Sequence, residues 1–301
     1  MTLGAIASNE KDILKRGGAY SVRKANAIPG GAAMPLDRAK ADASAGLAYG
    51  AGQDSEAGSG TSIFDPVLCE IAYRWFSPPG GLILDPFAGG SVRGIVAAKV
   101  GRQYVGCELR PEQVEANRAQ GSELCGDDEH PPAWVCGDSR NIDKHCAEVA
   151  ADMVFSCPPY ADLEVYSDDP ADLSTMPYEA FRVAYFEIIA KACALLRPDS
   201  FACFVVGEVR DKKGNYIDFV GDTVQAFRDA GLAYYNEAIL ITAAGSLPIR
   251  AGKQFSKSRK LGKTHQNVLV FLKGDAKRAV ARCGPVEIDE AMFAGMEEAP
   301  A

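Results

Sequence analysis

A chain of 301 residues, with 47% hydrophobic and 24% charged residues, is long enough for one large α/β core with appendages. This length predicts one main domain. The sequence carries no apolar run long enough to span a membrane and no secretory signal at its start, so we expect a cytoplasmic protein. The net charge of −8 excludes a protein that coats nucleic acid with its whole surface, because phosphate binding needs clustered Lys and Arg. Any basic surface must therefore be local.

Residues 1–60 are rich in Gly, Ala and Ser and show no helical or strand period, which predicts an N-terminal arm or linker, partly disordered. Apolar residues at helical spacing predict a first helix over 66–76, which a Ser-Pro-Pro-Gly-Gly run then ends. The main domain should cover 61–275, and 276–301 reads as a dispensable C-terminal tail.

The remaining patterns predict strands that alternate with helices. The strands are expected at 81–85, 102–108, 133–137, 152–156, 201–208, 237–243 and 267–273, and the helices at 91–100, 111–120, 178–196 and 217–230. This alternation predicts an α/β fold with a doubly wound, mostly parallel, Rossmann-like sheet and helices on both faces.

Nine cysteines occur without a CxxC pair, and several lie in apolar segments where a reduced thiol behaves as a small hydrophobe. The Cys and His residues between 125 and 146 have a spacing that fits no zinc finger or zinc ribbon. We therefore expect neither disulfides nor a bound metal.

The first strand ends in an acid and a glycine turn, a layout that lets the backbone approach a ligand closely. The turn consists of Asp85, Pro86, Phe87, Ala88, Gly89 and Gly90. Glu108 ends the second strand, where it can accept hydrogen bonds from ribose hydroxyls, and Asp138 follows the third strand, positioned to accept from an adenine amino group. A glycine turn alone also fits an ordinary strand-to-helix connection, but the three features together indicate a nucleoside site.

The fourth strand runs into a second turn, Ser156, Cys157, Pro158, Pro159 and Tyr160, in which two prolines force an extended backbone. Open α/β sheets bind their ligands beyond the carboxyl ends of the strands. A lone Pro-Pro-Tyr is often a surface loop, but its place after a buried strand favours a functional turn.

The glycine turn, the acid on strand two and the Pro-Pro-Tyr turn together resemble the DNA amino-methyltransferase family, which makes N6-methyladenine or N4-methylcytosine. Phe64 and Asp65 look like the start of that family's helix near the methionine end of the cofactor, and 264–271 looks like its closing strand. The resemblance covers about 61–274 and implies a methyltransferase sheet, S-adenosylmethionine as cofactor and double-stranded DNA as partner.

In that family's reaction the target is an exocyclic amine, a poor nucleophile because its lone pair is delocalised into the ring. Acceptors for its two hydrogens, from the side chain of residue 157 and the Pro158 carbonyl, favour a lone pair that faces the sulfonium methyl. Tyr160 can stack on the flipped base and offset part of an unstacking cost of about a few kcal/mol. The resemblance therefore implies that 156–160 is the catalytic turn.

The chain departs from the family at Cys157, where Asp, Asn or Ser is usual, and a thiol accepts hydrogen bonds weakly. Ser156, Asp162 and Glu164 are candidates for the missing acceptor. Alternatively, a Cys157 thiolate attacks C6 of a pyrimidine and permits methylation at C5. Because cysteine is shaped like serine, which in the family goes mostly with cytosine, we favour cytosine N4, with adenine N6 still open.

One local segment meets the need for positive charge, since 247–263 carries six basic residues and no acid: Arg250, Lys253, Lys257, Arg259, Lys260 and Lys263. A phosphate backbone could lie there, and a solvated loop is the alternative. Residues 161–174 and 211–216 are further candidates to face DNA, because only some sixty residues separate the two motifs and leave no room for a large recognition domain.

Two other functions stay open: an enzyme of the same fold that methylates RNA or a protein amide, and a catalytically silent DNA-binding relative. The sequence leaves the oligomeric state undecided and is compatible with a homodimer.

Overall fold

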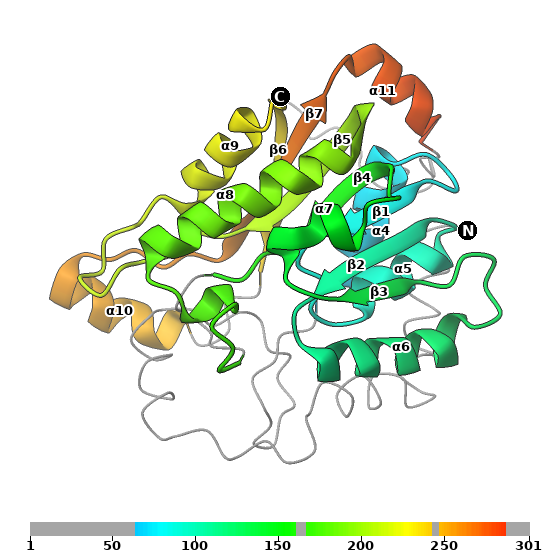
Figure 1. Ribbon diagram of the computed structural model, residues 1–301. Helices are drawn as coiled ribbons and strands as arrows, with labels where there is room; N and C mark the ends of the chain where they lie inside the picture. The colour runs from blue at the N-terminus through cyan, green and yellow to red at the C-terminus, as the bar shows by residue number, and fades with distance from the viewer. Residues whose placement is uncertain (1–63, 161–166, 243–246, 287–301) are drawn as a thin grey trace.

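The computed structural model describes residues 64–160, 167–242 and 247–286, so the predicted N-terminal arm lies outside it. A seven-stranded sheet has the order β3-β2-β1-β4-β5-β7-β6 (Figure 1). The strands are β1 Leu82–Asp85, β2 Gln103–Glu108, β3 Ala133–Cys136, β4 Ala151–Ser156, β5 Leu196–Val206, β6 Ala233–Ile241 and β7 His265–Lys273. Strands β1 to β5 pair in parallel, and β7 pairs antiparallel with both β5 and β6. The predicted doubly wound, mostly parallel sheet is confirmed.

Helices cover both faces of this sheet, and Figure 1 shows α8 in front of it with α4 and α5 behind. Their bounds are α4 Pro66–Phe76, α5 Val92–Lys99, α6 Pro111–Cys125, α7 Ile142–His145, α8 Tyr178–Leu195, α9 Phe219–Asp229, α10 Leu247–Ser258 and α11 Ala276–Cys283. Neighbouring residues along a strand enter opposite cores, as Ile83 packs with α4 and Leu84 with α8. The central strands β1, β4 and β5 are therefore buried on both faces, which accounts for their continuous apolar runs, whereas the edge strands β3 and β6 are partly exposed.

Three helices of the described residues were not predicted, of which α7 is a single short turn. α10 forms within the basic segment, and α11 lies in the stretch that we expected to be a tail. α11 is docked, because Arg278 pairs with Asp199 at 2.6 Å and Arg282 pairs with Asp152. Residues 276–283 therefore form a helix that is docked on the domain.

The strand order reverses between β1 and β4, which are direct neighbours at the centre of the sheet. In open α/β sheets this reversal leaves room for a ligand beyond the carboxyl ends of the strands. The glycine turn follows β1 and the Pro-Pro-Tyr turn follows β4, so both leave the sheet at the same edge. The predicted juxtaposition of the two turns is confirmed.

Candidate active site

The Asp85 carboxylate joins the two turns. Its Oδ1 accepts hydrogen bonds from Ser156 Oγ at 2.6 Å and from the Phe87 amide at 3.1 Å. Its Oδ2 accepts from Arg93 Nε at 2.6 Å and from the Tyr104 hydroxyl at 2.8 Å. A carboxylate offers about four lone-pair positions, and Asp85 is fully buried, so the protein itself saturates this group. Asp85, which we expected to contact the cofactor, instead holds β1, β2, β4 and α5 together.

Ser156 has the same inward orientation. Its side chain is fully buried, and its hydroxyl donates to Asp85. The expectation that Ser156 could receive hydrogen bonds from a target amine therefore needs correction, because this hydroxyl does not face a ligand. The two other candidates for that acceptor, Asp162 and Glu164, lie outside the described residues.

Arg93 on α5 shapes the glycine turn. Its Nη2 donates to the Phe87 carbonyl at 2.5 Å and to the Ala88 carbonyl at 2.9 Å, and its guanidinium lies 4.9 Å from the centre of the Phe64 ring. Burial alone would lower the pKa of Arg93, but the Asp85 carboxylate raises it above its ordinary value. Arg93 therefore stays charged and holds the turn in place.

The glycine turn packs apolar side chains against the core, and its backbone then bends at Gly89. Ala88 is fully buried, and the Phe87 ring lies 5.9 Å from Tyr185 between ring centres. Gly89 has φ +50°, in the left-handed region that favours glycine. This conformation turns the backbone back towards the end of β2.

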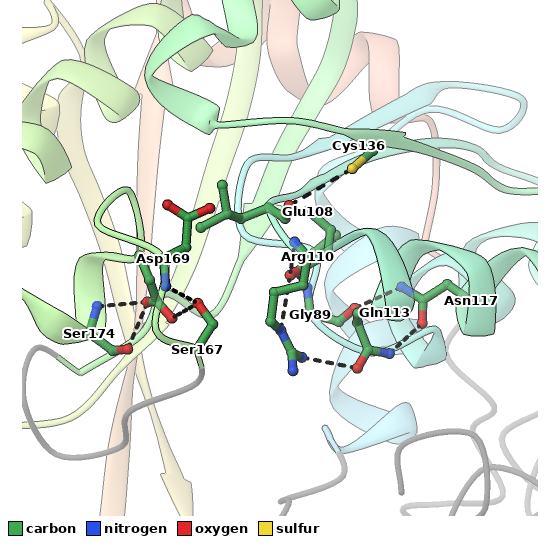
Figure 2. A network of polar contacts seen from close by, with 12 residues as sticks. Gly89, Glu108, Arg110, Gln113, Asn117, Cys136, Ser167, Asp169 and Ser174 are labelled. Carbon is green, nitrogen blue, oxygen red and sulfur yellow. Dashed lines mark hydrogen bonds and ion pairs between the residues drawn. The ribbon is translucent and has the colours of Figure 1, made fainter. Parts of the chain in front are cut away.

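The Glu108 carboxylate binds the backbone of the glycine turn. Its Oε2 accepts from the Gly89 amide at 2.9 Å, and its Oε1 accepts from the Arg110 amide at 3.0 Å (Figure 2). Asn117 Nδ2 donates to the Gly89 carbonyl at 2.7 Å and completes the support. Burial raises the pKa of Glu108, and hydrogen bonds from Arg110 and Gly89 oppose that shift. Among the described residues, Oε2 accepts one hydrogen bond, so it keeps a lone pair for a ligand hydroxyl.

Asp138 stands at the end of the next strand, where it begins a short 3₁₀ helix by accepting from the Arg140 amide at 2.8 Å. The following Ser139 donates to the Pro86 carbonyl at 2.6 Å, which ties this turn to the glycine turn. Glu108 at the end of β2 and Asp138 two residues after β3 therefore lie beside the glycine turn, and the Asp138 carboxylate also pairs with the Arg140 guanidinium at 2.7 Å. This set fits the ribose hydroxyls and the adenine amino group of S-adenosylmethionine.

The turn 156–160 is held by contacts with β7 and α9. Tyr160 accepts a hydrogen bond from Gln266 Nε2 on β7 at 2.8 Å, and its ring packs edge-on against Phe219 of α9 at 5.7 Å. Pro158 is buried, whereas Cys157 is half-buried at the margin of the core below α4. Sequence reasoning missed Gln266, although it lies inside the segment that resembles the family's closing strand.

The loop after β4 is described from residue 167 onward. There the Asp172 carboxylate accepts from Ser167 Oγ at 2.8 Å and from Ser174 Oγ at 2.7 Å. Figure 2 shows Ser167 and Ser174 across from the Glu108 network. The part of the loop next to α8 is therefore fixed by its own polar contacts.

The basic segment lies at the same edge of the sheet, because α10 connects the end of β6 to the start of β7 (Figure 1). Lys253, Lys257 and Arg259 are exposed, whereas the Lys260 ammonium lies against Gly214 in the turn 211–216. That turn adds two exposed lysines that our set of basic residues lacked: Lys212 and Lys213. Arg250 is on α10, with a side chain outside the described part.

Lys263 differs from the other basic residues. Its side chain is half-buried, and its Nζ donates to Asn267 Oδ1 at 3.4 Å. Burial lowers its pKa, although the nearby Glu208 and Glu237 carboxylates raise it. Lys263 therefore faces the interior of the site and not the exposed basic surface.

Comparisons with known proteins agree with this geometry. Residues 68–119 match a family described as DNA methylase, N6_N4_Mtase. The chain is 42% identical over 67 residues to the Type II methyltransferase M.XycI of Xanthomonas campestris pv. cyanopsidis, and 39% identical over 69 residues to M.Cfr9I of Citrobacter freundii. These stretches make up 22% of this chain and 22% and 23% of the two relatives. The predicted resemblance to the DNA amino-methyltransferases is confirmed, and S-adenosylmethionine is supported as the cofactor.

Similar solved structures include a putative SAM-dependent methyltransferase from Streptococcus mutans, with 15% identity and a TM-score of 0.48 over 72% of this chain and 51% of that one. TrmN from Thermus thermophilus has 16% identity and a TM-score of 0.45 over 69% of this chain and 48% of that one. Among the described residues, no helix is long and apolar enough to cross a membrane. The same part of the chain contains no group of three or more potential metal ligands.

Proposed function

We propose that this chain is a DNA methyltransferase that transfers a methyl group from S-adenosylmethionine to the exocyclic amine of a flipped base. The observation that carries the proposal is the hydrogen bond between Ser156 and Asp85, because it fixes the turn after β4 beside the turn after β1. Cytosine N4 is the preferred target, since Cys157 has the shape of the serine that accompanies cytosine in the family.

On the cofactor side, Glu108 accepts from the ribose hydroxyls and Asp138 from the adenine amino group, while Gly89 and Gly90 allow close approach of the backbone. Phe64 lines the methionine end, where it already covers Arg93. Asp65 begins α4 by accepting from the Val67 amide at 2.9 Å and so sets the place of Phe64. When bound, S-adenosylmethionine supplies an electrophilic methyl group.

On the target side, the Pro158 carbonyl and the Cys157 side chain hold the hydrogens of the amine. Tyr160 stacks on the flipped base, and its position is set by the contacts with Gln266 and Phe219. The two prolines keep these groups in place without further ordering at the moment of reaction. The chain therefore orients the amine. The remaining step is an in-line displacement, in which the amine takes the methyl group.

The DNA backbone lies along α10 and the turn 211–216, where exposed positive charge gathers at the edge that carries both turns. The residues that contact phosphate are Arg250, Lys253, Lys257, Arg259 and Lys260, with Lys212 and Lys213 from the turn. This local surface reconciles DNA binding with a net charge of −8.

Transfer of labelled methyl groups tests the proposal directly. The purified chain is incubated with S-adenosylmethionine and, separately, with unmethylated DNA, RNA or a protein extract. We expect label in DNA alone, with little transfer by Tyr160→Ala and normal transfer by Tyr235→Ala, which alters an exposed tyrosine near the start of β6, away from both turns. Label in RNA or protein alone would favour an enzyme of the same fold with another substrate, and no label would favour a silent relative.

A further inference from the structure

A buried carboxylate oxygen near the catalytic turn has no partner among the described residues. Glu208 follows the end of β5 by two positions, and its Oε1 accepts a long hydrogen bond of 3.3 Å from the Val220 amide at the start of α9. Its Oε2 is buried and accepts no hydrogen bond from the described part of the chain. Buried polar oxygens in native proteins nearly always have a donor, so an unmatched one needs an explanation.

Glu208 and the catalytic turn leave the sheet side by side. β5 is the parallel neighbour of β4, with Phe204 opposite Ser156. The helix that Glu208 touches begins with Phe219, and the Phe219 ring packs against Tyr160. Lys263, whose charge acts on Glu208, stands three residues before Gln266, which bonds the Tyr160 hydroxyl. Three separate links thus bring Glu208 to the Tyr160 side of the site.

The proposed chemistry needs acceptors for two amine hydrogens, and the Pro158 carbonyl is the one strong acceptor that the catalytic turn offers. Cys157 is a weak acceptor, and the Ser156 hydroxyl is already committed to Asp85. An amine that gains a methyl group also carries one proton too many and must lose it. A carboxylate close to the amine can meet both needs.

We propose that Glu208 is a catalytic residue that accepts a hydrogen bond, and then a proton, from the target amine. The inference rests on the proposed function. The nitrogen lone pair forms the new N–C bond, the C–S bond breaks with its electrons on sulfur, and the surplus proton moves from nitrogen to Glu208 Oε2 and then to water. The unmatched oxygen is thereby explained, because its donor is the substrate.

Burial raises the pKa of Glu208 above its ordinary value, which suits a group that must take up a proton near neutral pH. The Val220 hydrogen bond and Lys263 lower that pKa, and Asp218 raises it. Tyr178, at the start of α8, also lies within electrostatic range.

A structural role as the cap of α9 is the competing explanation, and Glu208→Gln separates the two. The matched control is Glu237→Gln, because Glu237 also acts on Lys263 but has both oxygens bonded, by Asn267 at 2.5 Å and by Tyr234 at 2.9 Å. We expect kcat with unmethylated DNA to fall on the order of 100-fold in Glu208→Gln, with KM for DNA and the melting temperature unchanged. The control should keep its kcat.

A lowered melting temperature with a matching loss of activity, or an equal loss in Glu237→Gln, would overturn the role of Glu208. If Glu208→Gln fails to fold, the wild-type pH profile decides. Activity should fall as the pH drops through the raised carboxyl pKa, and a flat acidic side would contradict the proposal. An inactive wild type overturns the proposed function as well, whereas an active Glu208→Gln overturns this inference alone.

Discussion

The Ser156 hydroxyl donates a 2.6 Å hydrogen bond to Asp85 Oδ1 and so connects the ends of β4 and β1. Both groups are fully buried, and the same carboxylate pairs with Arg93. The relative position of the two turns is therefore set by a charge-assisted contact in the core, before any ligand binds.

Ser156→Ala should destabilise the protein by about 1.5–3 kcal/mol, the usual loss for a hydrogen bond to a buried charge. It should also lower kcat, because the two turns lose their shared anchor. Ser200→Ala is the matched control: this serine is buried at the opposite end of β5, where it accepts from Arg282. Chemical denaturation and methyl transfer are measured for both, and equal losses of kcat would contradict the anchoring role.

Cys157→Ser should keep the activity or raise it by up to about tenfold, because a hydroxyl accepts hydrogen bonds better than a thiol. The measurement is kcat with unmethylated DNA. Complete loss of activity, together with a protein–DNA adduct trapped on 5-fluorocytosine, would instead support covalent catalysis and methylation at C5.

Gln266→Leu and Tyr160→Phe should each lower kcat several-fold, because each removes one side of the hydrogen bond that orients the Tyr160 ring. The double variant should lose little more than either single variant, since the residues act through one contact. Additive losses in this double-mutant cycle would show that Gln266 acts elsewhere.

Lys253→Ala and Lys257→Ala should weaken DNA binding without changing the melting temperature. Each lost phosphate contact should reduce the slope of log K against log salt by about 0.9. Lys99→Ala is the control, since Lys99 pairs with Asp128 at 2.8 Å, away from the basic surface. An unchanged slope in both α10 variants would exclude α10 from the DNA interface.

Arg282→Ala should lower the free energy of unfolding by roughly 1–3 kcal/mol, because the carbonyls of Pro198 and Asp199 lose their donor. Lys277→Ala, on the exposed side of the same helix, should change it by less than about 0.5 kcal/mol. Denaturant titration of both variants checks whether α11 is part of the folded domain. Equal stability would restore the view that this segment is a tail.

Local sequence signals predicted most of the fold. The bounds of α4 were predicted as observed, because Asp65 and Pro66 begin the helix and the Ser77-Pro78 step ends it. α10 escaped prediction because its apolar residues Ile249 and Phe255 are exposed and give no core-facing stripe. β5 begins at Leu196, five residues earlier than predicted. The strand thus includes Pro198 and Asp199, which the prediction had left out.

The site was harder to predict because burial decides what an acid does. Sequence spacing placed Asp85 and Glu108 at strand ends correctly, but only the packing of Arg93 and Tyr104 turns Asp85 inward. Glu208 carries no motif at all. Its importance follows from an unmatched oxygen, which is a property of the folded chain.

The most direct measurement is mass spectrometry of nucleosides from DNA treated with the chain and S-adenosylmethionine. The account predicts N4-methylcytosine in DNA from the wild type and almost none from Tyr160→Ala. N6-methyladenine would correct the choice of base and leave the chemistry intact. 5-Methylcytosine alone, or DNA without any new methylated base, would contradict the account.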